Sequence, residues 1–148
     1  MKRSVEVAGA ILLYQDKILG TKKGAAKYAY TSFKYEFPGG KLEPGESPAE
    51  ALHRELLEEM DLDIPVQRMK PYLCIDHTYP DFSIRLHTFL CPMDSPELNL
   101  KEHIEQRLFA PQELADWEWA PADAEVLQRL RTEDWKQEGG SQGDGQRG

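Results

Sequence analysis

Two pairs of apolar-rich segments organise the first two thirds of the chain. Residues 5–14 are rich in Val, Ile, Leu and Ala, and residues 17–21 follow a Gln-Asp turn, which predicts a β-hairpin. Residues 69–79 and 82–93 alternate apolar and polar positions around Pro80-Asp81 and predict a long antiparallel pair. Smaller elements complete the pattern: short strands at 35–37 and 107–109, and a surface loop at 22–34.

The helix predicted at residues 48–60 carries the strongest local signals. Ser47 and Glu50 have capping-box spacing, and Pro48 occupies the first helical position. An apolar stripe faces the core and consists of Ala49, Leu52, Leu56 and Met60. Asp61 ends the helix, because Asp tolerates the left-handed conformation of a helix stop. With shorter helices at 111–117 and 122–131, the chain is expected to form an α+β fold or an α/β/α sandwich.

Composition adds limits to this picture. The 148 residues suit one domain, expected at residues 1–136. Residues 137–148 hold five of the eleven glycines and no apolar side chain, which predicts a disordered tail. No apolar run is long enough to span a bilayer, and no export signal is evident, so a cytoplasmic protein without a membrane partner is expected. Cys74 and Cys91 are accordingly expected to be reduced, buried thiols.

The charge balance disfavours one large class of functions. Twenty-six acidic residues oppose 18 basic ones, for a net charge of −8. Such a field repels a nucleic acid duplex, so a DNA- or RNA-binding module is not expected. A small phosphorylated ligand is still compatible with this charge if divalent cations separate the two sets of negative charges.

The acidic residues cluster on the predicted helix. Glu55, Glu58 and Glu59 are spaced i, i+3 and i+4, so their carboxylates share one face. A solvated acidic surface is one interpretation. A metal site is the other, because Pro38-Gly39-Gly40 forces a tight backbone upstream that can turn carbonyl oxygens inward. Mg²⁺ prefers such carboxylate and carbonyl ligands, and Mn²⁺ is a substitute.

These residues resemble the Nudix box, G-x5-E-x7-R-E-U-x-E-E-x-G-U, in which U is a bulky aliphatic residue. The matching positions are Gly40, Glu46, Arg54, Glu55, Leu56, Glu58, Glu59 and Leu62. Asp61 stands where the box has a glycine, and this departure implies a modest conformational cost. The segments EFPGG, YPDFSIRLHTFLC, LKEH and WAPAD extend the similarity to MutT-type nucleoside triphosphate pyrophosphohydrolases over about residues 4–131. The resemblance implies the α/β Nudix fold, an α/β/α sandwich with mixed and antiparallel strands.

The resemblance also implies a reaction and its residues. Such enzymes use Mg²⁺ and an activated water to cleave a nucleoside triphosphate into a monophosphate and pyrophosphate. The implied metal ligands are the Gly39 carbonyl, Glu55, Glu58, Glu59 and Glu102. Glu55 is the first choice for general base and Glu102 its rival, while Arg54 orients the glutamates and Glu46 fixes the loop–helix junction. Lys23 matches a position facing the phosphates, although a plain solvated lysine is an equal alternative.

A nucleobase pocket is implied between the long strands and the last helix. Phe37 and Tyr79 match positions that line it, and Asp123 matches the residue that reads the base edge. An ionised carboxylate only accepts hydrogen bonds, so Asp123 favours a donor such as N4 of cytosine or N7–H of 8-oxoguanine. The alternative is that Asp123 caps the helix that begins beside it. None of the four histidines has metal-ligand spacing, and none is assigned to catalysis.

The expected protein is a monomeric or weakly dimeric hydrolase of (d)CTP-like triphosphates. Within enzymes, the alternatives are an 8-oxo-dGTP diphosphatase and a hydrolase of another diphosphate, such as a nucleotide sugar. Outside enzymes, the alternative is a non-catalytic base-binding domain of the same fold. That class usually lacks the box carboxylates, all of which are present here.

Overall fold

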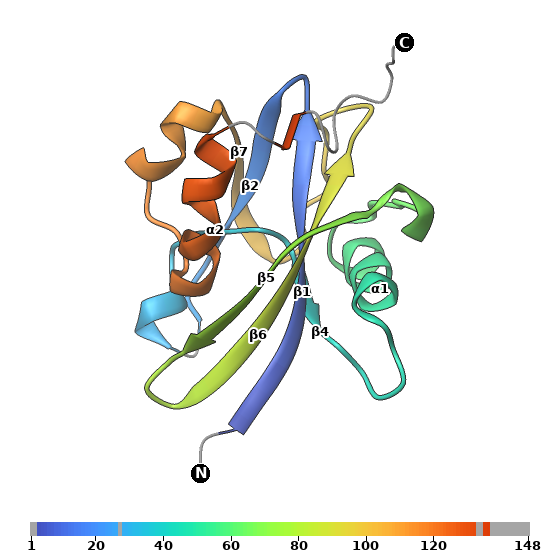
Figure 1. Ribbon diagram of the computed structural model, residues 1–148. Helices are drawn as coiled ribbons and strands as arrows, with labels where there is room; N and C mark the ends of the chain where they lie inside the picture. The colour runs from blue at the N-terminus through green and yellow to red at the C-terminus, as the bar shows by residue number, and fades with distance from the viewer. Residues whose placement is uncertain (1–2, 27, 133–134, 137–148) are drawn as a thin grey trace.

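The computed structural model describes residues 3–26, 28–132 and 135–136. In this part of the chain, seven strands form one mixed sheet with the main order β3-β2-β1-β6-β5 (Figure 1). The strands are β1 (Arg3–Tyr14), β2 (Lys17–Lys23), β3 (Tyr35–Glu36), β4 (Gly39–Lys41), β5 (Lys70–Thr78), β6 (Phe82–Pro92) and β7 (His103–Phe109). The central pair β1–β6 is parallel, whereas β4 joins β1 and β7 joins β2 in antiparallel fashion.

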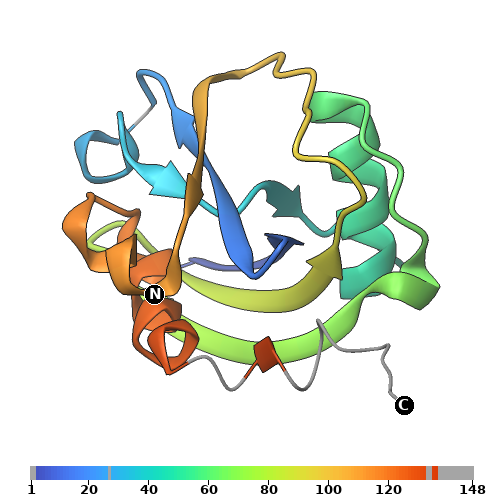
Figure 2. The ribbon, with the colours of Figure 1, turned by 90° about the horizontal axis from the view of Figure 1, so that it is seen from above.

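Helices cover both faces of this sheet. Helix α1 (Pro48–Met60) lies on one side and α2 (Pro121–Arg131) on the other (Figures 1 and 2). Successive side chains of β1 point to opposite faces of the sheet and so pack into two separate cores. Ala10 and Leu12 pack with α1, while Ile11 and Leu13 pack with α2. Short 3₁₀ helices lie at Ala29–Thr31, Val66–Arg68 and Pro111–Asp116. The expected α/β sandwich of mixed strands is confirmed.

Most expected elements are present with small shifts in their ends. The hairpin and the long antiparallel pair are confirmed as β1–β2 and β5–β6. Strand β7 starts at His103, four residues earlier than expected, and the helix expected at 111–117 is a 3₁₀ helix. Strand β4 was expected only as a tight turn. It forms because Gly39 pairs with Gly9 of β1, a partner thirty residues away that local pattern does not reveal.

Helix α1 has the ends that its sequence indicates. The Ser47 side chain accepts from the Glu50 backbone N–H at 3.1 Å, and the Glu50 carboxylate accepts from the Ser47 N–H at 2.9 Å. Asp61 adopts the left-handed conformation, with φ of 52°. Its backbone N–H donates to the Leu57 carbonyl and the Leu62 N–H donates to the Leu56 carbonyl, each at 3.1 Å, which closes the helix.

The two cysteines have different environments. Both are free thiols, and Cys91 is buried as expected. The expectation of a buried Cys74 is wrong, because this residue lies on edge strand β5 and faces away from the α2 core. The tail expected at 137–148 lies outside the described residues. Among the helices that are described, none is long and apolar enough to cross a membrane.

Candidate functional site

A cavity of about 490 Å³ gathers most of the site residues expected from the sequence. Its walls come from β1, the end of β2, β4, α1, the start of β7 and the start of α2. The expected residues that line it are Lys23, Phe37, Gly39, Gly40, Tyr79, Glu59, Glu102 and Asp123. Carboxylates lie at one end and aromatic rings at the other.

Arg54 organises the loop that precedes the acidic helix. Its Nε and Nη2 donate to the two Glu46 carboxylate oxygens at 2.7 and 2.9 Å, and Nη2 also donates to the Lys41 carbonyl at 3.1 Å. This bidentate pair lowers the pKa of Glu46 to about 2. Arg54 Nη1 reaches Glu55 at 3.1 Å and Glu58 at 3.4 Å. Arg54 therefore connects Glu46 and the Lys41 backbone, in the loop, to two carboxylates of α1.

Glu59 lies at the centre of the negative charge. Burial, a hydrogen bond with Glu55 and the charges of Glu55, Glu102 and Glu36 raise the pKa of Glu59 to about 8. Arg54 forms ion pairs with Glu55 and Glu58, whereas no described cation pairs with Glu59 in this way. Neither Glu55 nor Glu58 lines the cavity directly, and Glu58 differs from Glu55 because its side chain is more than half exposed.

Two glycines bring the β4 backbone against these carboxylates. A Cβ on Gly40 would lie 2.3 Å from the carboxyl carbon of Glu55, so only glycine leaves room for that side chain. Gly39 has φ of +157° and passes so close to β1 that a Cβ would lie 1.9 Å from the Ala8 carbonyl oxygen. The backbone of the Gly-Gly turn therefore borders the same space as Glu55 and Glu59.

The donor set suits a hard divalent cation. Carboxylate oxygens and the Gly39–Gly40 backbone meet at this end of the cavity. The raised pKa of Glu59 indicates negative charge that the described cations do not fully compensate. Within the described residues, no three acidic, histidine or cysteine side chains already form a closed cage for an ion. Such a cation would therefore complete its shell with backbone, water or ligand oxygens.

Asp123 lies at the opposite end of the cavity and is buried. Its Oδ2 accepts from the Phe37 backbone N–H at 2.7 Å, which joins α2 to the segment before β4. Burial, followed by the charge of Glu36, raises the pKa of Asp123 to about 8. The alternative of a helix cap is wrong, because Ala120 is the N-cap residue and Asp123 lies within the first turn, turned toward Phe37.

Aromatic rings form the wall beside Asp123. Tyr79 stacks on Tyr30 with ring centroids 4.8 Å apart and lies 5.2 Å from Phe82, and its hydroxyl accepts from the Ala122 N–H at 3.2 Å. Tyr28 and Phe82 also line the cavity. A flat ring with polar edges fits such a wall, because it can stack on the aromatic faces while Asp123 meets its edge.

Comparison with known proteins decides the family. The model of the NUDIX domain matches residues 4–137, which is most of the chain. The chain belongs to the Nudix family. Nudix hydrolases act on small nucleotide substrates and generally use divalent metal ions, so the carboxylate and aromatic ends of the cavity have the chemistry that this family needs.

Individual relatives narrow the type of hydrolase. The chain is 32% identical to the CTP pyrophosphohydrolase of Escherichia coli (strain K12) over 85% of its own length and 90% of that enzyme. It is 41% identical to the 8-oxo-dGTP diphosphatase of Proteus vulgaris, over 46% of this chain and only 59% of that enzyme. The solution structure of the E. coli ORF135 protein has 29% identity and a TM-score of 0.74, with 90% of this chain and 94% of that chain covered. The chain is thus of the nucleotide-pyrophosphohydrolase type.

The Nudix site contains two residues that the sequence did not single out. Glu36 and His103 line the cavity, and His103 Nε2 is 2.8 Å from Glu36 Oε2. His103 is buried, and its Nδ1 contacts no hydrogen-bond partner among the described residues. The available signal was their position within the segments EFPGG and LKEH, where they adjoin Phe37 and Glu102. Their pairing depends on the neighbouring strands β2, β3 and β7.

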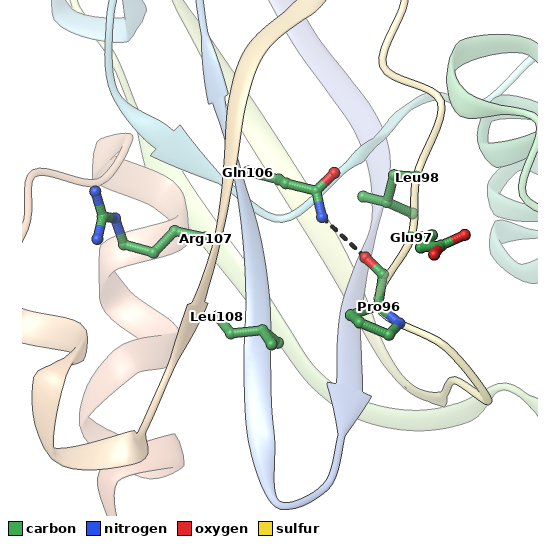
Figure 3. Close-up of a pocket in the computed structure, with 6 residues that line it drawn as sticks. All are labelled: Pro96, Glu97, Leu98, Gln106, Arg107 and Leu108. Atoms are coloured by element: carbon green, nitrogen blue, oxygen red, sulfur yellow. Dashed lines mark hydrogen bonds between the residues drawn. The ribbon is translucent and has the colours of Figure 1, made fainter.

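A second hollow, of about 520 Å³, lies between β7 and the loop that follows β6 (Figure 3). Gln106 Nε2 donates to the Pro96 carbonyl at 2.8 Å, and Leu98 and Leu108 lie beside this bond. Arg107 points to the other side of β7 (Figure 3). This hollow contains no cluster of carboxylates, so it is not the site described above.

Proposed function

We propose that this Nudix protein is a Mg²⁺-dependent pyrophosphohydrolase that cleaves nucleoside triphosphates, with a preference for (d)CTP-like substrates. One observation carries the proposal: a single cavity joins Glu59, which is hydrogen-bonded to Glu55, to the aromatic wall and Asp123. A triphosphate bound by its base at Asp123 would extend toward the carboxylates. We further propose a cytoplasmic, monomeric or weakly dimeric enzyme whose domain spans residues 1–136.

The proposed ligands of Mg²⁺ are the Gly39 carbonyl, Glu55, Glu58, Glu59 and Glu102. Bound there, Mg²⁺ supplies charge neutralisation and a water of lowered pKa. Glu58 would need to turn toward the cavity, because its side chain is more than half exposed and held by Arg54. Mn²⁺ is expected to substitute, since it accepts the same oxygen ligands.

The protein's own groups would position and activate the reactants. Lys23 lines the cavity and would meet the phosphates, while Arg54 holds Glu55 and fixes its orientation. Glu55 is the first choice to take the proton of the attacking water. Glu102 is its rival, because it is exposed and lines the cavity directly.

The cytosine preference rests on Asp123 and on one relative. Asp123 can accept from an exocyclic amine, and the relative named CTP pyrophosphohydrolase matches over 90% of its own length. Phe37 and Tyr79 would hold the flat ring of the base. The enzyme would discriminate against bases that present a hydrogen-bond acceptor to Asp123, because two acceptors facing each other in a buried site leave both without a donor.

An 8-oxo-dGTP diphosphatase is the second candidate, and one observation favours it. The pKa of Asp123 is raised to about 8, so near neutral pH the buried carboxyl retains a proton in the absence of ligand. A protonated carboxyl donates as well as accepts, so it can meet both O6 and N7–H of 8-oxoguanine. Four relatives named 8-oxo-dGTP diphosphatase match shorter parts of the chain.

A nucleotide panel tests the proposal and separates the two candidates. The experiment measures kcat/KM with Mg²⁺ for CTP, dCTP, dGTP and 8-oxo-dGTP, and identifies the products in ¹⁸O-water. The proposal expects pyrophosphate, a labelled product and the highest kcat/KM for CTP or dCTP. The highest value for 8-oxo-dGTP selects the second candidate, and exclusive release of orthophosphate overturns both. Nucleotide binding without turnover identifies a non-catalytic domain.

A further inference from the structure

Asp61 is the one position of the Nudix box at which this chain departs from the pattern, which has a glycine. The backbone requirement of that position is met, because Asp61 takes the left-handed conformation with φ of 52° and ψ of 32°. A glycine would adopt this conformation with less strain. The aspartate side chain must therefore be explained by what it contacts.

The Asp61 carboxylate holds the segment that leads to β7. Lys101 Nζ donates to Asp61 Oδ1 at 2.8 Å, and Asn99 Nδ2 donates to Oδ2. Two backbone bonds lie beside these contacts: Asn99 N–H donates to the Met60 carbonyl at 3.4 Å, and Lys101 N–H donates to the Glu59 carbonyl at 3.2 Å. The end of α1 and residues 99–101 are thus joined by four hydrogen bonds.

This junction lies between two groups of the proposed metal site. The Glu59 backbone carbonyl is itself an acceptor in this junction, and Glu102 directly follows Lys101. Both carboxylates line the cavity, and the charge of Glu102 acts on Glu59. A segment held at residues 99 and 101 leaves Glu102 little freedom to move away from α1.

We propose that Asp61 is a positioning residue that anchors residues 99–101 to the end of α1 and so fixes Glu102 opposite Glu59. The inference deepens the proposed function, because it rests on a role of Glu102 in that site. Glycine at this position provides the helix stop alone. Aspartate provides the stop and also two side-chain acceptors for the neighbouring segment.

The test compares Asp61→Gly with the wild-type chain in two measurements. Amide hydrogen exchange at Lys101 is expected to become faster, since its bond to the Glu59 carbonyl loses the adjacent anchor. The value of kcat/KM is expected to fall roughly tenfold, within the range for residues that orient metal ligands. Asp63→Gly is the matched control, because Asp63 faces His53 at 3.8 Å instead of residues 99–101. Asp61→Asn, which tolerates the left-handed conformation, should give a smaller loss.

A double-mutant cycle shows whether the effect passes through Glu102. In a Glu102→Gln background, Asp61→Gly should change kcat/KM by less than about twofold, because the residue being positioned is already disabled. Equal losses in both backgrounds, or unchanged exchange at Lys101, would overturn the inference. If the wild-type chain hydrolyses no triphosphate, the proposed function fails, and the exchange measurement alone decides whether Asp61 anchors the segment.

Discussion

Replacing Asp123 by asparagine should change the pH dependence of stability. The folded chain raises the pKa of Asp123 from 3.8 to about 8, chiefly by burial. Between these values the folded state retains a proton that the unfolded state has lost, so stability falls as pH rises. A change of about four units, at about 1.36 kcal/mol per unit, amounts to about 5 kcal/mol in the free energy of unfolding. The full stabilisation is present below pH 4 and is lost as pH rises through about 8.

Asparagine preserves the shape of the side chain without its titration. Its amide oxygen can still accept from the Phe37 N–H, so the bond between α2 and the cavity wall is retained. Relative to wild type, Asp123→Asn should therefore gain about 5 kcal/mol between pH 4 and pH 9. Urea denaturation followed by tryptophan fluorescence measures this difference, and Asp16→Asn, in the exposed β1–β2 turn, is the matched control. Parallel pH profiles for all three proteins would show that Asp123 is ionised when folded, and the support for 8-oxo-dGTP would be lost.

Three other changes test the site and the thiols. Glu59→Gln should retain the fold but bind Mg²⁺ more than about tenfold more weakly, as measured by calorimetry. EDTA should abolish turnover by the wild-type chain. Normal turnover by the variant, or by the EDTA-treated wild type, would contradict the metal site. Gly40→Ala should displace the Glu55 carboxylate and lower kcat by up to about a hundredfold at an unchanged melting temperature. A thiol reagent should label Cys74 alone in the folded chain and Cys91 only in urea, because burial raises the pKa of Cys91 to about 12; equal labelling would contradict the burial difference.

Local signals explain which parts of the fold were predictable. Helix α1 is specified by its own residues, since the Ser47–Glu50 capping box and the apolar stripe lie within one segment. The end of this helix is also specified locally, by the left-handed conformation of Asp61. Strand β4 is different, because it exists through pairing with β1 and has no apolar alternation of its own.

The candidate site shows the same division. The box residues could be assigned because they resemble the Nudix box, whereas the environment of Asp123 depends on Phe37, which is 86 positions away in the chain. The Glu36–His103 contact spans 67 positions and requires β2 to lie between their strands. Cys74 was misjudged for a related reason: an alternating strand predicts which residues share a face, but not how far a helix extends over that face.

Glu36 joins the two ends of the cavity electrostatically. Its charge contributes to the raised pKa of Glu59 at the carboxylate end and to that of Asp123 at the aromatic end. His103, held at 2.8 Å, is the polar group that restrains the Glu36 side chain. Neutralising the carboxylate cluster would reduce the negative potential in the cavity, but the charge of Glu36 would still act directly on Asp123. The protonation of Asp123 therefore depends more on Glu36 than on the charge at the carboxylate end, because the nearer charge in a poorly solvated cavity has the larger effect.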